Sequence, residues 1–403
     1  MNEKINFEEE LKKCKTMEDL LGKNGLIKRM IKGTLEGMLQ AELENHLGYE
    51  KSSKKGNNSG NSRNGKSRKN VKSTFGEVPI EIPRDRNGTY EPLAIPKYKT
   101  DISDFDQKII SMYAKGMTTR DIQDHILDIY GVDVSPAMVS MITDKVIIHA
   151  TEWQSRILAT LYPIIFFDAI HFKVRENGKV ITKASYTCLG IDAEGKKDIL
   201  GIWIGENEGA TFWLSVFNEL KNRGVQDGLI ACMDGLKGLP EAIKAVFPQV
   251  QVQLCIIHMI RNSMKYVGSK NKKEFMNDLK EIYQAPSRIT AETALSNLQY
   301  KWLKIYPLAV NPWLNHWENV AGYFAYPADL RRLIYTTNAI ESLHRQLRKV
   351  TKNRAVLNTD QALFKLLYLA GQDIQKKWTH SIRDWQSILT QLLIIFKGRL
   401  TIN

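Results

Sequence analysis

Short apolar runs alternate with helical stretches between residues 162 and 257, and this order is the strongest constraint on the fold. Five runs have the length and composition of buried strands: Tyr162–Asp168, Ala184–Asp192, Ile199–Ile204, Leu229–Asp234 and Val250–Ile257. Helical patterns follow the third run at Ala210–Asn222 and the fourth at Pro240–Phe247. Three strands, a helix, a strand, a helix and a strand predict an α/β domain, with a mixed sheet and helices packed on it.

Two of these runs end in an aspartate that is a candidate functional residue. Asp168 and Asp234 each follow an uninterrupted apolar stretch. Side chains at the carboxyl end of a buried strand reach the open edge of the sheet, so both carboxylates are expected there. Strand-terminal aspartates are also common turn formers, and Asp192, in the sequence Asp-Ala-Glu-Gly, is interpreted in that way.

A third acid lies in a basic amphipathic helix predicted from Thr336 to Lys349. Apolar residues recur at helical spacing and would form its buried stripe: Ile340, Leu343, Leu347 and Val350. Asn338, Glu341, Arg345 and Arg348 follow the same spacing on the adjacent stripe. Such a face can hold a divalent metal through its glutamate while its arginines bind phosphate. In isolation, a solvated helix with ordinary charge pairs is the commoner interpretation.

The two aspartates and Glu341 together favour a catalytic interpretation. Three carboxylates that converge from separate elements repel one another strongly unless cations lie between them. A pair of Mg²⁺ ions about 3.5 to 4 Å apart would occupy such a cluster and clamp the attacking and leaving oxygens of a phosphoryl transfer. Asp168, Asp234 and Glu341 are therefore the candidate catalytic residues.

Residues 51–72 carry a large share of the net charge of +13. The segment contains eight Lys and Arg residues, no acid, and many Gly, Asn and Ser residues. This composition predicts a flexible basic linker between a helical region at 1–50 and a short β segment at 73–100. A polyanion partner is implied, and the lack of a hydrophobic anchor favours nucleic acid over membrane. The candidate phosphate contacts are Lys54, Lys55, Arg63, Lys66, Arg68 and Lys69.

Residues 101–150 are predicted to form a helix-turn-helix DNA-binding domain. Its helices are expected at Phe105–Ala114, from a capping box at Thr118 and Asp121 to Gly131, and from Ser135 and Pro136 to about Ile148. The third would be the recognition helix, with Ser140, Thr143 and Lys145 as candidate groove contacts. A plain three-helix bundle is the structural alternative.

The remaining segments continue the same domain organisation. Residues 151–260 would hold the first part of the sheet domain, 261–335 an all-helical insertion, and 336–403 the C-terminal helices. The tryptophans of the insertion are more often core residues than stacking platforms for bases, and they are Trp302, Trp313 and Trp317. Cys255 and His258 have no matching second pair for a zinc site, which favours a structural or DNA-proximal role.

The cysteines and the apolar runs indicate a cytoplasmic protein. Four cysteines are scattered without paired spacing, as expected of reduced thiols. No apolar run is long enough to span a bilayer, and the N-terminus lacks the apolar stretch of a signal peptide.

Several motifs resemble those of the Mutator-type transposases of bacterial insertion sequences. They cover nearly the whole chain in order: Gly56–Gly65, Gly76–Arg86, Asp168–His171, Met233–Gly235, Leu254–His258, and Tyr335–Leu343 with Arg348. The resemblance implies an RNase H-like catalytic domain with a DDE triad, a helical insertion before the last acid, and DNA cleavage with strand transfer. It makes Asp168, Asp234 and Glu341 the ligands of two Mg²⁺ ions, for which Mn²⁺ can substitute. It also makes Arg348, seven residues past Glu341, a DNA contact.

The expected partner is double-stranded DNA, both terminal inverted repeats and target, bound by a homodimer or higher oligomer at the bacterial nucleoid. Two other interpretations stay open. The chain could be a catalytically inactive DNA-binding regulator of the same fold, although a regulator has no need of three convergent acids. It could also be a Mg²⁺-dependent nuclease without strand transfer.

Overall fold

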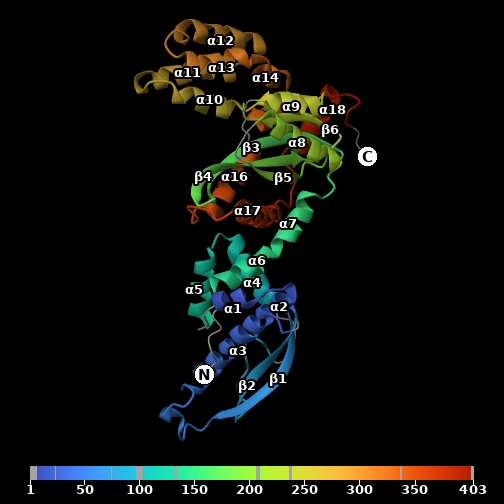
Figure 1. Ribbon diagram of the computed structural model, residues 1–403. Helices are drawn as coiled ribbons and strands as arrows, with labels where there is room; N and C mark the ends of the chain where they lie inside the picture. The colour runs from blue at the N-terminus through green and yellow to red at the C-terminus, as the bar shows by residue number, and fades with distance from the viewer. Residues whose placement is uncertain are drawn as a thin grey trace. The chain divides into compact units, whose positions relative to one another are not determined.

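The computed structural model describes residues 7–22, 24–73, 75–96, 103–130, 134–205, 209–235, 238–335 and 338–400. The chain divides into two compact units, Met1–Ile147 and Ile148–Asn403 (Figure 1). Both units contain helices and strands. Within the described ranges, no helix combines the length and the apolar character needed to cross a bilayer.

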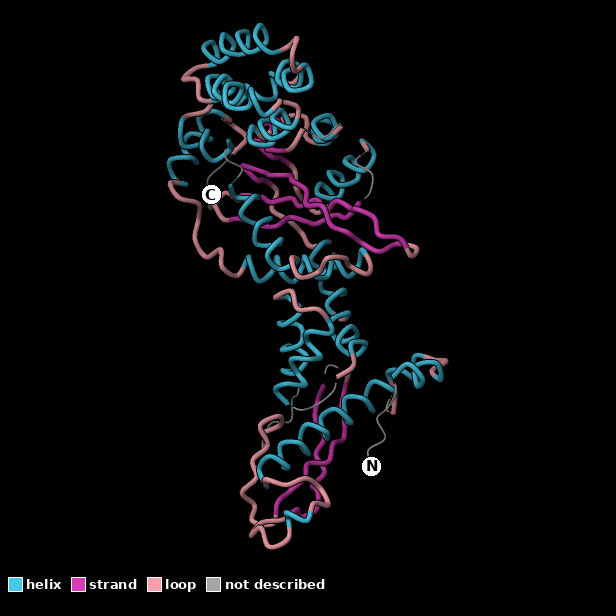
Figure 2. Tube along the Cα trace, turned by 90° about the vertical axis from the view of Figure 1, so that its left-hand side faces the viewer, coloured by secondary structure: helices cyan, strands magenta, loops and turns pink. Residues whose placement is uncertain are grey.

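In the first unit a long helix packs on a β-hairpin (Figures 1 and 2). The unit begins with the helices α1 (Phe7–Lys13), α2 (Met17–Leu21) and α3 (Leu26–Leu47). α3 buries a stripe of apolar side chains: Leu26, Ile27, Met30, Ile31, Leu35, Met38, Leu39 and Leu43. The hairpin consists of β1 (Arg63–Ser73) and β2 (Gly76–Asp85). The helical region predicted at the N-terminus therefore finds a partner for its apolar stripe within the same chain.

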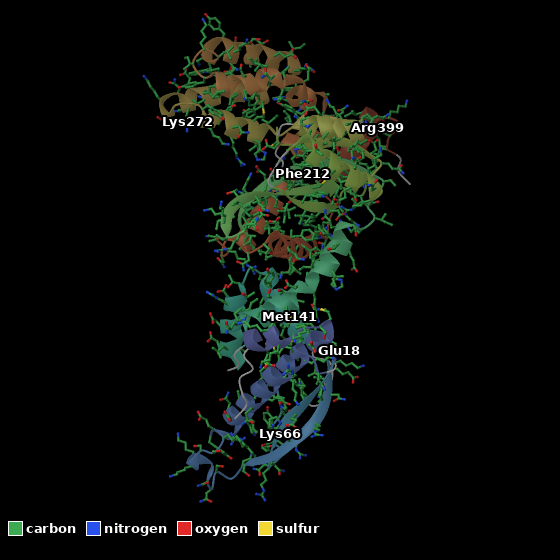
Figure 3. The ribbon with its side chains drawn as sticks, viewed as in Figure 1. Glu18, Lys66, Met141, Phe212, Lys272 and Arg399 are labelled. Atoms are coloured by element: carbon green, nitrogen blue, oxygen red, sulfur yellow. The ribbon has the colours of Figure 1, made fainter. Side chains whose placement is uncertain are left out.

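The prediction of a flexible linker over residues 51–72 is wrong for its second half, which is strand β1. β1 pairs antiparallel with β2, whose residues 76–85 are the short β segment expected after it. Val71 lies opposite Val78 and both are buried, whereas Lys66 and Arg68 lie on the exposed face of β1 (Figure 3). The polar composition of this segment did not indicate a strand. A strand is stabilised mainly by pairing with its neighbour and by packing, and neither can be recognised from the segment's own residues.

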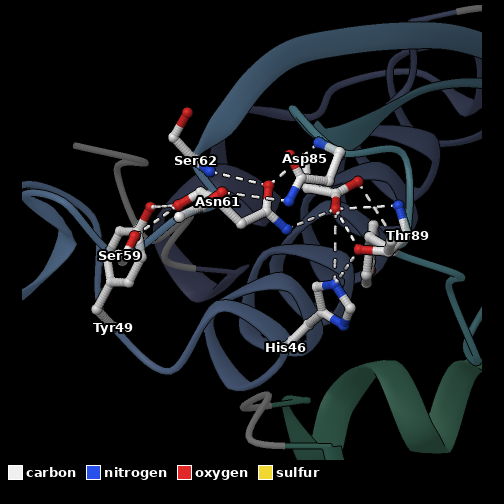
Figure 4. A network of polar contacts seen from close by, with 10 residues as sticks. His46, Tyr49, Ser59, Asn61, Ser62, Asp85 and Thr89 are labelled. Atoms are coloured by element: carbon white, nitrogen blue, oxygen red, sulfur yellow. Dashed lines mark hydrogen bonds and ion pairs between the residues drawn. The ribbon is translucent and has the colours of Figure 1, made fainter.

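The loops at the open end of the hairpin are joined by the buried carboxylate of Asp85 (Figure 4). Its oxygens accept hydrogen bonds from Asn61 Nδ2 at 2.8 Å, Thr89 N at 3.1 Å, Thr89 Oγ1 at 2.7 Å and Tyr90 N at 3.2 Å. Burial acts to raise the pKa of this carboxyl, but the hydrogen bonds outweigh it and hold the pKa well below its usual range. Tyr49 Oη also donates to Asn61 O at 2.9 Å, which fixes this loop to the end of α3.

Three short helices follow the hairpin: α4 (Ser103–Ala114), α5 (Thr119–Tyr130) and α6 (Pro136–Asp144). The predicted capping box is present, since Thr118 N donates to Asp121 Oδ2 at 2.8 Å and Asp121 N donates to Thr118 Oγ1 at 3.1 Å. Ser135 caps α6 through its hydroxyl, as its sequence position before a proline predicts. α6 ends one turn earlier than expected, and the chain continues as α7 (Val146–Gln154).

The second unit is built on a mixed sheet that has five strands among the described residues. They are β3 (Leu161–Glu176), β4 (Lys179–Ile191), β5 (Lys197–Gly205), β6 (Asp227–Met233) and β7 (Gln251–Leu254). Their spatial order is β5-β4-β3-β6-β7, with antiparallel pairing from β5 to β3 and parallel pairing from β3 to β7. The predicted order of strands and the mixed α/β sheet are confirmed. β3 and β4 are longer than their apolar runs because their polar ends pair with each other, as far as Glu176 opposite Lys179.

Helices cover both faces of this sheet (Figures 1 and 2). They are α8 (Ala210–Asn222) and α9 (Leu239–Val246) on one face, and α16 (Asn338–Thr351) and α17 (Asp360–Gln375) on the other. Phe167 of β3 packs edge-on against Phe217 of α8 at 5.1 Å between ring centroids, and Trp213 is also buried there. α16 contacts β3, and α17 contacts β5. A last helix, α18 (Trp385–Ile395), follows them.

The described residues from 256 to 335 are helical and contain no strand. Their α-helices are α10 (Ile256–Lys265), α11 (Lys272–Tyr283), α12 (Arg288–Trp302), α13 (Pro307–Asn315), α14 (Trp317–Ala321) and α15 (Ala328–Tyr335). Trp302 and Trp313 are buried, and Trp313 Nε1 donates to Ser263 Oγ at 2.9 Å, which ties α13 to α10. These two tryptophans are core residues, as their type predicted.

Candidate active site

Asp168 and Asp234 follow neighbouring parallel strands in register. Phe167 of β3 lies opposite Met233 of β6, and each aspartate is the next residue along its chain. β6 ends before Asp234, as expected, but Asp168 lies inside β3 because that strand continues in its pairing with β4. Each carboxylate accepts a hydrogen bond from the backbone N–H of the following residue, at 2.8 and 2.7 Å. The strand pairing therefore places the two acids at the same edge of the β3–β6 pair.

Two histidines contact the Asp168 carboxylate. His344 Nδ1, from α16, lies 3.0 Å from Oδ2, and His258 Nε2, from α10, lies 3.9 Å from Oδ1. His344 is buried, and among the residues that the structure describes its other ring nitrogen, Nε2, has no hydrogen-bond partner. Cys255 is the residue at which α10 begins, so it lies one turn before His258.

These contacts set the charges of the site. Burial acts to raise the pKa of the Asp168 carboxyl, but His344 and His258 outweigh it and the pKa is lowered. Burial acts to lower the pKa of His258, but a hydrogen bond with Cys255 and the negative charges of Asp168 and Asp234 raise that pKa to about 9. Near neutral pH, Asp168 is therefore a carboxylate and His258 a cation. His258 therefore lies beside one of the candidate acids, and Cys255 lies beside His258; their predicted role stays a prediction.

The third acid is carried by α16. Ile340, Leu343 and Leu347 are buried, so the predicted apolar stripe does anchor this helix. The Oε1 atom of Glu341 is buried and accepts no hydrogen bond of normal geometry from the described part of the chain, although Arg261 Nη2 of α10 lies 3.2 Å away. Glu341 thus faces α10 rather than open solvent.

In this structure two of the three acids contact basic side chains. Asp168 contacts His344, and Glu341 contacts Arg261. Across the described part of the chain, no group of three or more His, Cys, Asp or Glu side chains is arranged to hold a metal ion. The assignment of the three acids as metal ligands stays a prediction.

A basic cavity of about 620 Å³ lies between α16 and the part of β3 that follows Asp168. Its cationic lining comes from Arg345, Arg348, Lys349 and Lys352, and His171 lines it from β3. No acid is among its described lining residues. The two arginines of α16 that were predicted to contact DNA, Arg345 and Arg348, therefore line one basic cavity. The two lysines were missed because Lys349 lies outside the stripe that contains Glu341 and Lys352 lies beyond the end of the predicted helix.

The predicted contacts on the hairpin fall into two groups. Lys54, Lys55, Lys66 and Arg68 are exposed. Arg63 instead donates to Tyr49 O at 3.0 Å and pairs with Glu44 at 3.4 Å, and Lys69 donates to Pro96 O at 3.1 Å. Lys66, although exposed, also donates to Glu81 Oε2 at 3.0 Å, so three of the six predicted cations are bonded within the protein in this conformation.

The predicted contacts on α6 are mostly internal. Thr143 is fully buried and donates to the carbonyl oxygens of Val139 and Ser140, so it cannot reach a DNA groove in this conformation. Lys145 lies over the ring of Phe75, and burial lowers its pKa to about 8. Ser140 is partly exposed and remains the candidate contact.

Comparison with known proteins identifies the family. Residues 2–381 match the family described as Transposase, Mutator family. The chain is 45% identical to a probable transposase for insertion sequence element ISRM3-like from Sinorhizobium fredii, over 94% of this chain and 95% of that protein. It is 32% identical to the transposase for insertion sequence element IS905 from Lactococcus lactis, over 83% and 85% of the two chains. The chain belongs to the Mutator family of transposases.

Proposed function

We propose that this transposase cleaves DNA and transfers strands by a metal-dependent reaction at Asp168, Asp234 and Glu341. The observation that carries the proposal is the register of β3 and β6, which makes the two aspartates neighbours. The spatial order of the strands, third-second-first-fourth-fifth in sequence order, supports an RNase H-like catalytic fold. The helical residues from 256 to 335 then correspond to the insertion before the last acid.

The residues present fit a divalent cation. Carboxylate oxygens are the ligands that Mg²⁺ and Mn²⁺ prefer. The buried Oε1 of Glu341 accepts no hydrogen bond of normal geometry among the described residues, and it lies 3.2 Å from the Arg261 guanidinium, so its surroundings already favour a positive charge there. A pair of Mg²⁺ ions would supply an activated water and stabilise the leaving oxygen of the phosphodiester. The acids of this chain would position the ions, and His344 would keep Asp168 ionised and oriented.

DNA recognition is assigned to both units. In the first unit the helices α4 to α6 act as the helix-turn-helix, and the exposed cations of the hairpin add phosphate contacts. In the second unit the basic cavity beside α16 takes the sugar-phosphate backbone near the acids. A homodimer or higher assembly would hold two terminal inverted repeats at once, at the nucleoid in the cytoplasm.

The test is incubation of the full chain with the DNA ends that flank its own gene, in Mg²⁺ or Mn²⁺, followed by identification of the cut strand. We expect cleavage at the ends of the terminal repeats. Pre-nicked ends should then be joined to a target duplex. Cleavage without any joined product would favour a nuclease, and binding without cleavage would favour a regulator.

The basic cavity gives a prediction for salt dependence. Replacing Arg348 and Lys352 together with alanine should reduce the slope of log K against log salt for DNA binding by about 2, because each lost phosphate contact removes about 0.9. Fluorescence anisotropy with a flanking-end duplex over a salt series measures the slope. Lys376 and Lys377, exposed at the end of α17, provide a double-alanine control with the same change in charge. Equal slopes for the two double variants would rule out the cavity as a DNA site.

A further inference from the structure

α10 presents two cationic side chains to the candidate acids. His258 contacts Asp168, and Arg261, three residues later on the same helix, contacts Glu341 through Nη2 and Oε1 at 3.2 Å. Within the described part of the chain, Glu341 is the ion-pair partner recorded for Arg261. One helix therefore contributes a positive charge to each of two acids that come from different elements.

The ion pair between Arg261 and Glu341 can be broken without disrupting the packed interior. The Arg261 side chain is 60% exposed, so water reaches its guanidinium, although the Glu341 Oε1 atom that it contacts is itself buried. Ion pairs of this exposure contribute little to stability. The guanidinium can leave Glu341 toward solvent without crossing the packed interior, because most of its surface is already outside.

We propose that Arg261 and a divalent cation compete for Glu341, and that the released guanidinium then binds a phosphate of the DNA strand. The inference rests on the proposed metal role of Glu341 and adds a residue to it. Oε1 lies 3.2 Å from the guanidinium, so a cation bound to this oxygen displaces the arginine. Arg261 is then an uncompensated cation at the edge of the acidic cluster.

A phosphate of the DNA is the ligand that the guanidinium of Arg261 is best suited to bind. A guanidinium presents a planar fork of donors that matches two oxygens of a phosphate, and it keeps its charge at any physiological pH. A phosphodiester held at the three acids would lie beside the arginine that now contacts one of them. Metal binding and DNA binding would thereby favour each other through a single side chain.

The alternative is a purely structural salt bridge that joins α10 to α16. The two roles predict opposite signs for metal binding. If Arg261 competes with the cation, its removal strengthens metal binding in the absence of DNA. If the contact only supports the fold, its removal weakens metal binding or leaves it unchanged.

The experiment measures Mn²⁺ affinity of the full-length protein without DNA by isothermal titration calorimetry. Arg261→Ala should bind Mn²⁺ about two- to five-fold more tightly than wild type, as expected for loss of a weak competing pair. Lys265→Ala is the matched control: Lys265 lies one turn later on α10, is exposed, and donates to Asn262 Oδ1 rather than to an acid of the site. This control should bind Mn²⁺ like wild type, and Glu341→Gln should bind it more weakly.

A second measurement follows the released arginine. Binding of a flanking-end duplex is compared in Ca²⁺ and in EDTA, and the gain in affinity with Ca²⁺ should shrink by about three- to ten-fold in Arg261→Ala but not in Lys265→Ala. Unchanged or weaker Mn²⁺ binding by Arg261→Ala, together with a loss in Glu341→Gln, would overturn the exchange and leave the metal role of Glu341 intact. Wild-type protein that binds no Mn²⁺ would overturn both.

Discussion

An Asp234→Asn variant is expected to cleave the DNA ends that flank its gene at least about 100-fold more slowly than wild type, as when one preorganised electrostatic group is removed. Asparagine has the same shape and can still accept the hydrogen bond from the backbone N–H of Gly235, now 2.7 Å from Oδ1. The fold around β6 is therefore kept while the negative charge beside Asp168 is lost. DNA affinity should stay within about two-fold, because the phosphate contacts are cationic side chains elsewhere.

Asp192 offers a control with the same substitution at an aspartate that follows another strand of the same sheet. Its carboxylate accepts a hydrogen bond from Lys196 N at 2.7 Å within the turn after β4, as the sequence predicted. Asp192→Asn should cleave like wild type. Cleavage rates come from single-turnover assays in Mg²⁺, and affinities from fluorescence anisotropy with the same duplex. If Asp234→Asn cleaves at the wild-type rate, the assignment of the three acids is wrong.

The sequence predicted those features of the site that depend on local patterns. The apolar runs before Asp168 and Asp234 placed both acids beside buried strands, and helical spacing placed Glu341 next to a buried stripe on α16. The succession of strands along the chain and the spacing of apolar residues in a helix are local properties. They can therefore be predicted without knowing which elements pack together. The helix caps at Thr118 and Ser135 were predicted for the same reason.

The contacts between elements could not be predicted in this way. His344 follows Leu343 of the apolar stripe, and nothing in the local pattern shows that it meets Asp168 from another element. Its position three residues after Glu341 was the available signal, since such residues lie on neighbouring parts of a helix surface. Arg261 was equally hidden, because its partner lies 80 residues later in the chain.

In the hairpin the error had another cause, because the composition of residues 51–72 predicted a linker where part of the segment is a strand. Gly, Asn, Ser and Lys between residues 51 and 72 are typical of a linker, yet residues 63–73 form β1. The pairing with β2 and the packing on α3 decide the structure, and neither is visible in the segment itself. The loop before β1 is bonded to an aspartate, Asp85, that lies more than twenty residues later in the sequence.

That aspartate, Asp85, is predicted to be the most sensitive polar residue of the first unit. Asp85→Ala should lower the free energy of unfolding by roughly 3 kcal/mol, because it removes the acceptor of the hydrogen bonds from Asn61, Thr89 and Tyr90, of which Tyr90 is buried. Urea denaturation of the full chain measures this change, and hydrogen exchange should show faster exchange at residues 57–62 and 86–90. Glu77→Gln, at an exposed residue of β2 in the same hairpin, is the control and should stay close to wild type.

The ionisation of Asp85 adds a pH dependence whose direction follows from its lowered pKa. Because the folded-state pKa is depressed, the stabilisation is fully present above the unfolded-state pKa of about 3.9 and is lost as the pH falls toward the folded-state value. In Asp85→Asn the new amide group would face the donors of Asn61 and Thr89, so this variant should be less stable than wild type at pH 7. Because asparagine cannot titrate, the stability of the first unit in this variant should change little as the pH is lowered. Hydrogen exchange of the hairpin at pH 7 and pH 3 separates the two proteins. A wild-type hairpin that keeps its full protection at pH 3 would show that the Asp85 carboxylate does not hold these loops. The exposed cations next to the loops would then owe their positions to other contacts.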